Sequence, residues 1–462
     1  MSEVRENKMG TMPMFPLILS MSLPAMFSML IQALYNVVDS IFVARFSPKA
    51  LSAVSLAFPL QLVMVAFAVG TAIGVNSLIA RRLGAQNYTD ANLAASHGMI
   101  LAVFSWLLFV VVGLAFSGGF ISLFTADQEI LTFGTQYLSI VLCVSFGMMM
   151  STMCEMILQS TGNMIIPMLT QLLGAVINII FDPLLIFGLW IFPRLGVVGA
   201  TVATVFGQIC SMTFVLIILL TKKHEVKISF KGFRFKKNII RDIYAVGFPA
   251  IIMQSIGSVM VSGINAIISM SGVPVEVAET NINAFGVYFK LQSFVFMPVF
   301  GLNQGVSPII GYNFGARNKK RMFSALRWGI LIAVIIMTAG LLVFQIAPGW
   351  LLSLFDAQAS PVENTALMDV GIPVLRTISL CFVFAAVGIM FTALFQAIGY
   401  GFYSMIMSFA RQLVVLLPVA FFLSKIDLGV MWYAFPVAEL ACLVVAIIFF
   451  MILQKKEFRY MN

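Results

Sequence analysis

Runs of apolar residues long enough to cross a membrane recur from one end of the chain to the other. A helix needs roughly 20 residues to cross a hydrocarbon layer about 30 Å thick. With 61% of residues hydrophobic and only 10% charged, the chain holds far more apolar side chains than the core of a soluble protein needs. The sequence therefore predicts an all-α polytopic membrane protein, because helices satisfy their own backbone hydrogen bonds in lipid and the alternation typical of barrel strands is absent.

Twelve transmembrane helices can be placed along the chain. They are predicted at residues 14–44, 51–80, 91–116, 131–160, 164–190, 196–220, 243–271, 281–312, 322–346, 369–397, 402–424 and 430–454. Basic residues favour cytoplasmic loops. With the N-terminus inside, the outer segments hold only Arg45, Lys49, Arg194 and Lys425. We therefore expect both termini to lie in the cytoplasm.

A basic stretch at residues 221–242 divides these spans into two sets of six. The predicted domains are an N-terminal six-helix lobe (1–220), a basic cytoplasmic linker (221–242) and a C-terminal six-helix lobe (243–462). The linker interleaves Lys and Arg with phenylalanines, but no nucleic-acid-binding motif accompanies the charge. Anionic lipid headgroups attract such a segment by roughly 1 kcal/mol per basic residue. We expect membrane lipids as partners, and neither nucleic acid nor an obligate protein partner.

The two sets of six spans resemble each other. Residues of the second span recur 231 positions later in the eighth, among them Gly70, Gly74 and Gly84 as Gly301, Gly305 and Gly315. Repetition at a constant offset of half the chain indicates a duplicated unit. Because six is an even number, both copies enter the membrane from the same side, which predicts two bundles related by a parallel internal repeat around a central cavity.

Polar residues inside the spans are the candidates for function, because ionisable groups are costly at that depth. The first span carries a stripe with the spacing of one helical face. Further polar residues share faces of the fifth and sixth spans. The three sets are Gln32, Tyr35, Asn36 and Asp39; Asn178 and Asp182; and Thr201, Thr204 and Gln208. Asp39 and Asp182 both fall in the outward half of their spans, which predicts that they meet as a carboxylate site.

The other intramembrane charges are less informative. Asp39 and Asp182 have a structural alternative, in which each carboxylate only fixes helix packing. Glu155 lies near the inner end of its span, where we expect it to reach water and to be dispensable. For Glu439, Lys290, Arg376 and Arg411, ion pairing and substrate contact both remain open. The five cysteines lie in apolar runs without CxxC spacing, so we expect no resident cofactor, and carboxylates must carry any proton coupling.

The motifs, taken in order, resemble those of the multidrug and toxic compound extrusion (MATE) transporters, in particular a MepA-like bacterial branch. The match covers essentially the whole chain. The segments that carry it are Tyr35-Asn36-Val37-Val38-Asp39, Leu83-Gly84-Ala85, Gln159-Ser160-Thr161-Gly162-Asn163 with Pro167-Met168, Asn178 to Asp182-Pro183-Leu184, Met297-Pro298 with Gly301-Leu302, and Pro308-Ile309-Ile310-Gly311 to Gly315-Ala316.

This resemblance implies a V-shaped pair of bundles in the bacterial cytoplasmic (inner) membrane that exports organic, mainly cationic, compounds in exchange for H⁺ or Na⁺. It implies ion coupling at Asp39, Asn178, Asp182 and Thr201, with Asp39, Asn178 and Asp182 as ligands if the ion is Na⁺. Substrate would contact Gln32, Tyr35 and Asp39, and the stripes add Asn36 and Gln208. Pro24 matches the position at which the first helix of the family bends. The seventh span lacks the acid of some sodium-coupled members, which argues against cation coupling in the C-terminal lobe.

Three other functions fit a polytopic chain less well. A lipid-linked oligosaccharide flippase of the same superfamily would need several basic residues in its cavity for pyrophosphate, whereas the N-terminal stripes are acidic and amidic. An integral membrane enzyme would need a nucleophile with a base or a metal cluster. A channel would suit a continuous pore better than two unlike lobes with deep carboxylates. The sequence therefore favours a transporter over a flippase, an enzyme or a channel.

Overall fold

A computed structural model describes residues 7–354 and 361–461, and every regular element in these two ranges is a helix. In the first half of the chain the helices are α1 (Lys8–Thr11), α2 (Met14–Phe46), α3 (Pro48–Gly84), α4 (Tyr88–Ser122), α5 (Gln128–Cys143), α6 (Phe146–Ser160), α7 (Ile165–Phe187) and α8 (Val197–Thr221). In the second half they are α9 (Lys237–Ser269), α10 (Val275–Gly315), α11 (Lys319–Ile346), α12 (Pro348–Ser353), α13 (Pro361–Ser379), α14 (Phe382–Ala397), α15 (Gly401–Phe409), a π-helical turn (Ala410–Leu416), α16 (Leu417–Ser424), α17 (Leu428–Met431), α18 (Ala434–Lys456) and a short 3₁₀ turn (Phe458–Tyr460).

The all-helical membrane architecture predicted from the sequence is confirmed. Ten helices in the described residues are long and apolar enough to cross a membrane, or up to twelve spans if each of two bent pairs is one span. The bent pairs are α5 with α6, at 44°, and α13 with α14, at 47°. The spans predicted at residues 131–160 and 369–397 are thus each divided into two helices that meet at an angle.

Side chains from neighbouring helices compensate for both breaks. The indole Nε1 of Trp106, on α4, donates to the Cys143 carbonyl at a distance of 2.9 Å. At the second break, Gln345 on α11 donates to the Arg376 carbonyl at 2.7 Å. A carbonyl that loses its helical partner at membrane depth needs another donor. The breaks escaped the sequence analysis because those donors come from other helices.

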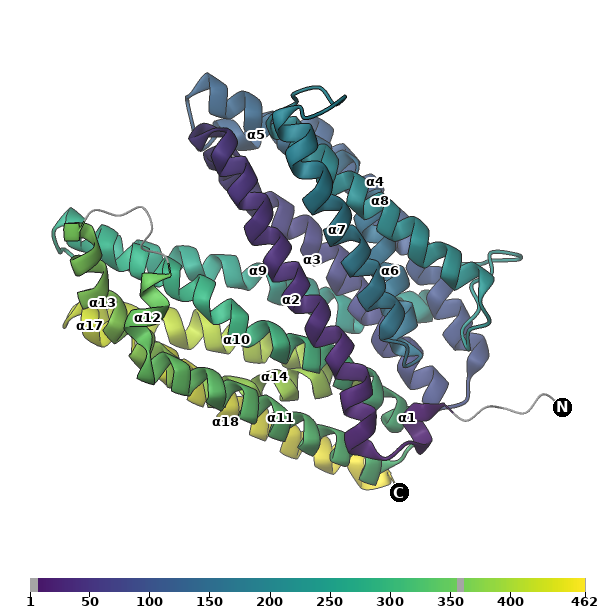
Figure 1. The fold of residues 1–462 in the computed structure, drawn as a ribbon. Coiled ribbons are helices and arrows are strands. Elements are labelled where there is room, and N and C mark those ends of the chain that lie inside the picture. The colour runs from purple at the N-terminus through teal and green to yellow at the C-terminus, as the bar shows by residue number, and fades with distance from the viewer. Residues whose placement is uncertain (1–6, 355–360, 462) are drawn as a thin grey trace.

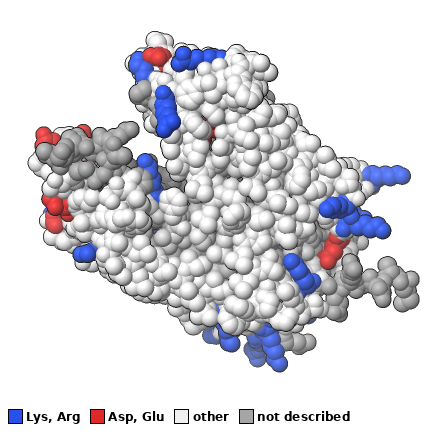
Figure 2. Space-filling model, in the orientation of Figure 1, with Lys and Arg blue, Asp and Glu red and all other residues white. Residues whose placement is uncertain are grey.

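The helices form two groups that meet like the arms of a V (Figure 1). One arm contains α2 to α8 and the other α9 to α18, and the start of α2 and the end of α18 lie at the end where the arms meet. The surface is hollowed between the arms at the opposite end (Figure 2). The main contacts between the arms join α3 to α9 and α10, and α2 to α10.

The repeated glycines lie where the two arms touch. A Cβ atom on Gly74 would overlap the Ile243 carbonyl of α9, and one on Gly305 would overlap the backbone of Ser22 on α2. Gly84 and Gly315 face the backbones of Tyr312 and Arg81 in the same way. Small residues let helix backbones approach closely, which is a main source of helix association in membranes. The internal repeat therefore reappears as a repeated contact between the arms.

The N-terminal segment joins both arms at the end where they meet. Arg321, at the start of α11, donates to the Met12 carbonyl at 2.7 Å and to the Met9 carbonyl at 3.2 Å. From the same segment, Asn7 donates to Glu225 Oε2 at 2.7 Å. Partial burial raises the pKa of Glu225, although the hydrogen bond from Asn7 opposes this. Helix α1 thus fastens the first arm to the second.

The basic segment between α8 and α9 is docked on α4. The backbone N–H of Lys227 donates to Asn92, that of Ser229 to the Ser96 hydroxyl, and that of Lys236 to His97 Nε2 at 3.0 Å. This end of the molecule is rich in basic side chains (Figure 2). The linker is therefore held by hydrogen bonds to the first arm.

Because glycines form the contact between the arms, a glycine-to-alanine change should lower the stability of the protein at this contact but not elsewhere. Gly74→Ala should lower the free energy of unfolding by about 1–3 kcal/mol through overpacking. Gly257→Ala is the matched control, because nothing lies within 4 Å of the added atom; it should be neutral or stabilise by up to about 1 kcal/mol through helix propensity. Thermal unfolding in detergent measures both. Equal effects of the two changes would contradict the assigned contact.

Candidate functional site

Two carboxyl groups meet in the first arm. The carboxyl groups of Asp39 on α2 and Asp182 on α7 lie close enough to interact electrostatically. Asp182 is fully buried. The structure thus brings together the two residues that the sequence analysis paired.

Three acceptor oxygens at this position lack a donor. Asp39 Oδ1, Asp182 Oδ2 and Asn178 Oδ1 are buried and receive no hydrogen bond from any group in the described residues. Leaving a buried acceptor unsatisfied costs about 1–3 kcal/mol. A proton or a small cation would satisfy the carboxyl oxygens, and a cation that prefers oxygen ligands could also bind the amide oxygen.

Hydrogen bonds of Asn178 join Asp182 on α7 to α8. Asn178 Nδ2 donates to Asp182 Oδ1 at 3.3 Å and to the Thr204 hydroxyl at 3.1 Å. Thr201 is fully buried, and its hydroxyl donates to the Val197 carbonyl of its own helix at 2.9 Å. Thr204, which the sequence analysis placed on a polar stripe but not in the ion site, is therefore the threonine that contacts Asn178.

Two tyrosines lie within electrostatic range of the carboxyl pair. Tyr35, one turn before Asp39, interacts electrostatically with both carboxyl groups. Tyr137, on α5, also lies within electrostatic reach of the pair, and its hydroxyl donates to Gln61 on α3 at 3.2 Å. The sequence analysis assigned no role to Tyr137. Its place near the carboxyl pair depends on the packing of α5 against α3, α4 and α8.

The remaining predicted contacts are spread along α2 and α8. Gln32 is exposed on α2, and Gln208 is partly buried on α8. The side chain of Asn36 lies outside the described residues. Helix α2 continues through Pro24 from Met14 to Phe46. The roles of these residues in binding and bending stay predictions.

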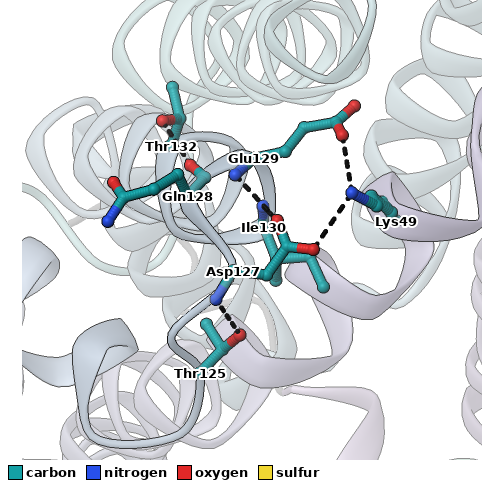
Figure 3. A network of polar contacts seen from close by, with 7 residues as sticks. All are labelled: Lys49, Thr125, Asp127, Gln128, Glu129, Ile130 and Thr132. Atoms are coloured by element: carbon teal, nitrogen blue, oxygen red, sulfur yellow. Dashed lines mark hydrogen bonds and ion pairs between the residues drawn. The ribbon is translucent and has the colours of Figure 1, made fainter.

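At the far end of the first arm, one lysine joins two helices (Figure 3). Lys49 Nζ, near the start of α3, lies 3.0 Å from Asp127 Oδ2 and 2.8 Å from Glu129 Oε2. Asp127 also caps α5 by accepting from the backbone N–H groups of Glu129 and Ile130. The hydrogen bond from Lys49 is the main cause of the lowered pKa of Asp127. This exposed cluster ties the α4–α5 loop to α3.

Glu155 differs from expectation. Its side chain was expected to reach water, but it is buried, and both of its oxygens accept hydrogen bonds. Ser151 donates to Oε1 and Gln171, on α7, donates to Oε2, each at 2.9 Å. A carboxylate near the end of a span can snorkel outward, but the packing of α7 against α6 covers this one.

The second arm has a different polar cluster. Arg411 Nη1, in the π-helical turn, lies 3.0 Å from Glu439 Oε1 on α18. Arg411 also lines a cavity of about 90 Å³, together with Met253, Phe300, Asn303, Gly388, Ile389, Thr392, Met407, Ser408 and Cys442. The sequence analysis left ion pairing and substrate contact open, and the structure shows an ion pair beside a small cavity. π-helical turns occur frequently at functional sites.

The two arms therefore differ in whether their intramembrane charged groups are paired. Asn178 and Thr204 join α7 to α8, and Arg411 and Glu439 join the corresponding helices of the second arm. The first arm holds uncompensated acidic groups, whereas the second holds a neutral pair. Among the described residues, no group of three or more His, Cys, Asp and Glu side chains is arranged to hold a metal ion.

Comparison with known proteins agrees with this geometry. The family model described as MatE matches residues 24–184 and 249–422. Multidrug export protein MepA of Staphylococcus haemolyticus is 27% identical over 431 residues, which are 93% of this chain and 91% of the relative. A Staphylococcus aureus protein of the same name is 26% identical over 448 residues, covering 96% and 95%.

Two solved structures have the same fold. An outward-facing multidrug resistance MATE family transporter of the MOP superfamily matches with a TM-score of 0.87 and 27% identity, covering 94% of this chain and 95% of the other. A MOP superfamily transporter from Pyrococcus furiosus, described as having a binding pocket of reverse polarity that suggests a different function, matches with a TM-score of 0.88 and 26% identity, with the same coverage.

The Arg411–Glu439 pair predicts that the stability losses of the two single variants do not add in the double variant. Glu439→Gln leaves the guanidinium partly buried without a counter-charge and should lower the free energy of unfolding by about 3 kcal/mol. The double change Arg411→Met with Glu439→Gln should recover most of this loss, because no unpaired charge remains. Thermal unfolding of the wild-type protein, both single variants and the double variant measures the coupling. Additive losses would show that the pair contributes no coupling energy.

Proposed function

Because the chain belongs to the MATE family of membrane transporters and is not an enzyme, we propose that it exports organic, mainly cationic, drugs and toxic compounds in exchange for H⁺ or Na⁺. The names of the MepA relatives support multidrug export. In this proposal residues 1–220 and 243–462 are the two moving lobes, and residues 221–242 link them.

The observation that carries this proposal is the pair of buried carboxyl groups. Asp39 and Asp182 meet in a poorly solvated place and lack the positive charge that would satisfy Asp39 Oδ1 and Asp182 Oδ2. A proton, a sodium ion or a cationic substrate can each supply that charge. Species that satisfy the same charge compete for the site. Competition of this kind is the physical basis of exchange.

The coupling ion would bind among Asp39, Asn178 and Asp182. One proton would join the two carboxyl groups. A sodium ion would take oxygen atoms from all three side chains, since hard cations prefer oxygen ligands. Tyr35 and Tyr137 place aromatic surface beside the same position. A lipophilic cation would gain contact with these rings and with the carboxylate together.

The charge distribution supports the direction of transport. The end that holds the start of α2 and the end of α18 is rich in basic side chains, and the hollow opens at the other end (Figures 1 and 2). Basic residues favour the cytoplasmic side. We therefore place both termini in the cytoplasm of a bacterial cell, with the hollow facing outward. An ion that enters from outside would then displace the substrate toward the outside.

The lipid-linked oligosaccharide flippase remains the alternative from the same superfamily. The Pyrococcus furiosus transporter is described as having a pocket of reverse polarity, so the fold alone does not decide the sign of the substrate. In this chain the first arm has two carboxyl groups at its buried site, and Arg411 of the second arm is already paired with Glu439. That balance favours cations over a pyrophosphate group.

The carboxyl pair should act as one unit in transport. Asp39→Asn and Asp182→Asn should each reduce ion-driven efflux to the level of vesicles without protein, and the double variant should be little worse, because residues that share one ion are not additive. Efflux from proteoliposomes, driven separately by a proton or a sodium gradient, measures the effect and identifies the ion.

Glu155→Gln is the matched control for these variants, since it neutralises another buried carboxyl group of the same arm. It should retain driven efflux. If Asp39→Asn protein exports at the wild-type rate, ion coupling is located elsewhere, and Glu439 becomes the next residue to test.

The negative charge of the site predicts that dyes of similar size and shape are exported at different rates if their charges differ in sign. A cationic dye should be exported at least about tenfold faster than a matched anionic one. Two unit charges about 4 Å apart interact by about 4 kcal/mol at an effective dielectric constant of 20, well above the 1.4 kcal/mol that a factor of ten requires. Fluorescence efflux from loaded vesicles measures both rates. Equal rates would refute the proposed substrate class.

A further inference from the structure

An open groove lies on the exposed face of α11, away from the carboxyl pair. It has a volume of about 310 Å³ and is lined by Lys320, Ser324, Arg327, Trp328 and Leu331. These positions follow the spacing of one helical face. Lys320, Arg327, Trp328 and Leu331 are exposed, and Ser324 is partly so. The sequence analysis assigned no function to these residues.

The hydrogen-bond donors in this groove have no partner among the described residues. In the described parts of the chain, no hydrogen bond or ion pair is formed by Lys320 Nζ, the Ser324 hydroxyl, the Arg327 guanidinium or the Trp328 indole N–H. Two of these groups are cations, and the groove lining contains no acidic residue. A guanidinium with a nearby ammonium and hydroxyl suits the oxygens of a phosphate group. The groove therefore has the chemistry of an anion site.

The length and direction of the groove identify the kind of anion. Lys320 and Leu331 are eleven positions apart, or roughly 16 Å along the helix axis at 1.5 Å per residue. Helix α11 is one of the candidate membrane spans, and Lys320 lies at its first turn. A ligand that fills the groove must be charged at the membrane surface and apolar further in. Trp328, between the two ends, is a residue type that prefers the membrane interface.

We propose that this groove binds an anionic phospholipid from the cytoplasmic leaflet, with its phosphodiester held by Lys320, Ser324 and Arg327 and its acyl chain along Trp328 and Leu331. Placement in the cytoplasmic leaflet rests on the proposed orientation. Binding itself does not depend on the proposed ion coupling, so either can fail without the other.

The site lies at a junction between the two arms. The ring of Phe15, at the start of α2, packs on Trp328 with 5.0 Å between ring centroids. Next to Lys320 on the same helix, Arg321 holds the N-terminal segment through the Met9 and Met12 carbonyls. A lipid bound against Trp328 stabilises the arrangement in which α2 and α11 touch. Binding to one arrangement alone raises its stability by mass action.

The test compares two pairs of basic residues. Wild-type protein, Lys320→Gln with Arg327→Gln, and the control Lys222→Gln with Lys223→Gln are placed in lipid nanodiscs. The control removes the same charge from exposed positions at the same end of the molecule. Retention of phosphatidylglycerol against phosphatidylcholine is measured by native mass spectrometry. The control should lose up to roughly 30-fold, which is the general attraction of about 1 kcal/mol for each basic residue. The groove variant should lose at least about tenfold more, because it also removes the charge-assisted hydrogen bonds to the phosphodiester.

Two further measurements distinguish a bound lipid from a bound small anion and from general attraction to the membrane surface. Phosphatidylglycerol, added to wild-type protein in detergent, should raise the thermal unfolding midpoint, and the groove variant should not respond. Inorganic phosphate should neither displace the lipid nor reproduce this shift, because it lacks the acyl chain.

Three results would overturn the proposal. Equal loss of the lipid preference in the groove variant and the control would show a general surface attraction. An unchanged preference in the groove variant would show that the lipid binds elsewhere. Displacement of the lipid by inorganic phosphate would show that the groove is a site for small anions.

Discussion

The closeness of the helix backbones between the two arms is the constraint on which the rest of the architecture depends. Lipid tails are as apolar as the helices, so burial of apolar surface does little to hold membrane helices together, and tight packing must do so. Gly74 against α9 and Gly305 against α2 provide that packing. Because the same contact occurs twice, the arms can meet along one seam at the basic end and diverge at the other (Figure 1). The hollow between them is a consequence of where the glycines are.

The two arms share this packing but differ in the charges that they hold within the membrane. The second arm balances Arg411 with Glu439, which leaves little net charge beside its cavity. The first arm has Asp39 and Asp182 together without a counter-charge. An unbalanced buried charge is unfavourable for stability alone, but it is what a site needs if it is to bind and release an ion. A duplicated fold thus holds one ion-paired polar cluster and one unpaired carboxyl cluster, at which we propose that exchange takes place.

The breaks in two spans and the burial of Glu155 show where reasoning from the sequence fails in a membrane protein. A helix can break at membrane depth only if a donor from elsewhere satisfies the freed carbonyl, as Trp106 and Gln345 do. Likewise Glu155 is buried because Ser151 and Gln171 supply both of its hydrogen bonds. The sequence of a single span carries no record of such donors, since Trp106, Gln345 and Gln171 each belong to a different helix from the group they contact.

The sequence by itself determined the membrane class, the duplication and the two acidic residues, because the length of an apolar run, a constant offset and a charge in an apolar segment are all properties of the chain read in order. Only the tertiary structure decided which side chains meet. It placed Asp182 beside Asp39, selected Thr204 rather than Thr201 as the partner of Asn178, and brought Tyr137 to the same position. Those contacts depend on the rotation and crossing of packed helices, which the order of residues along one helix does not specify.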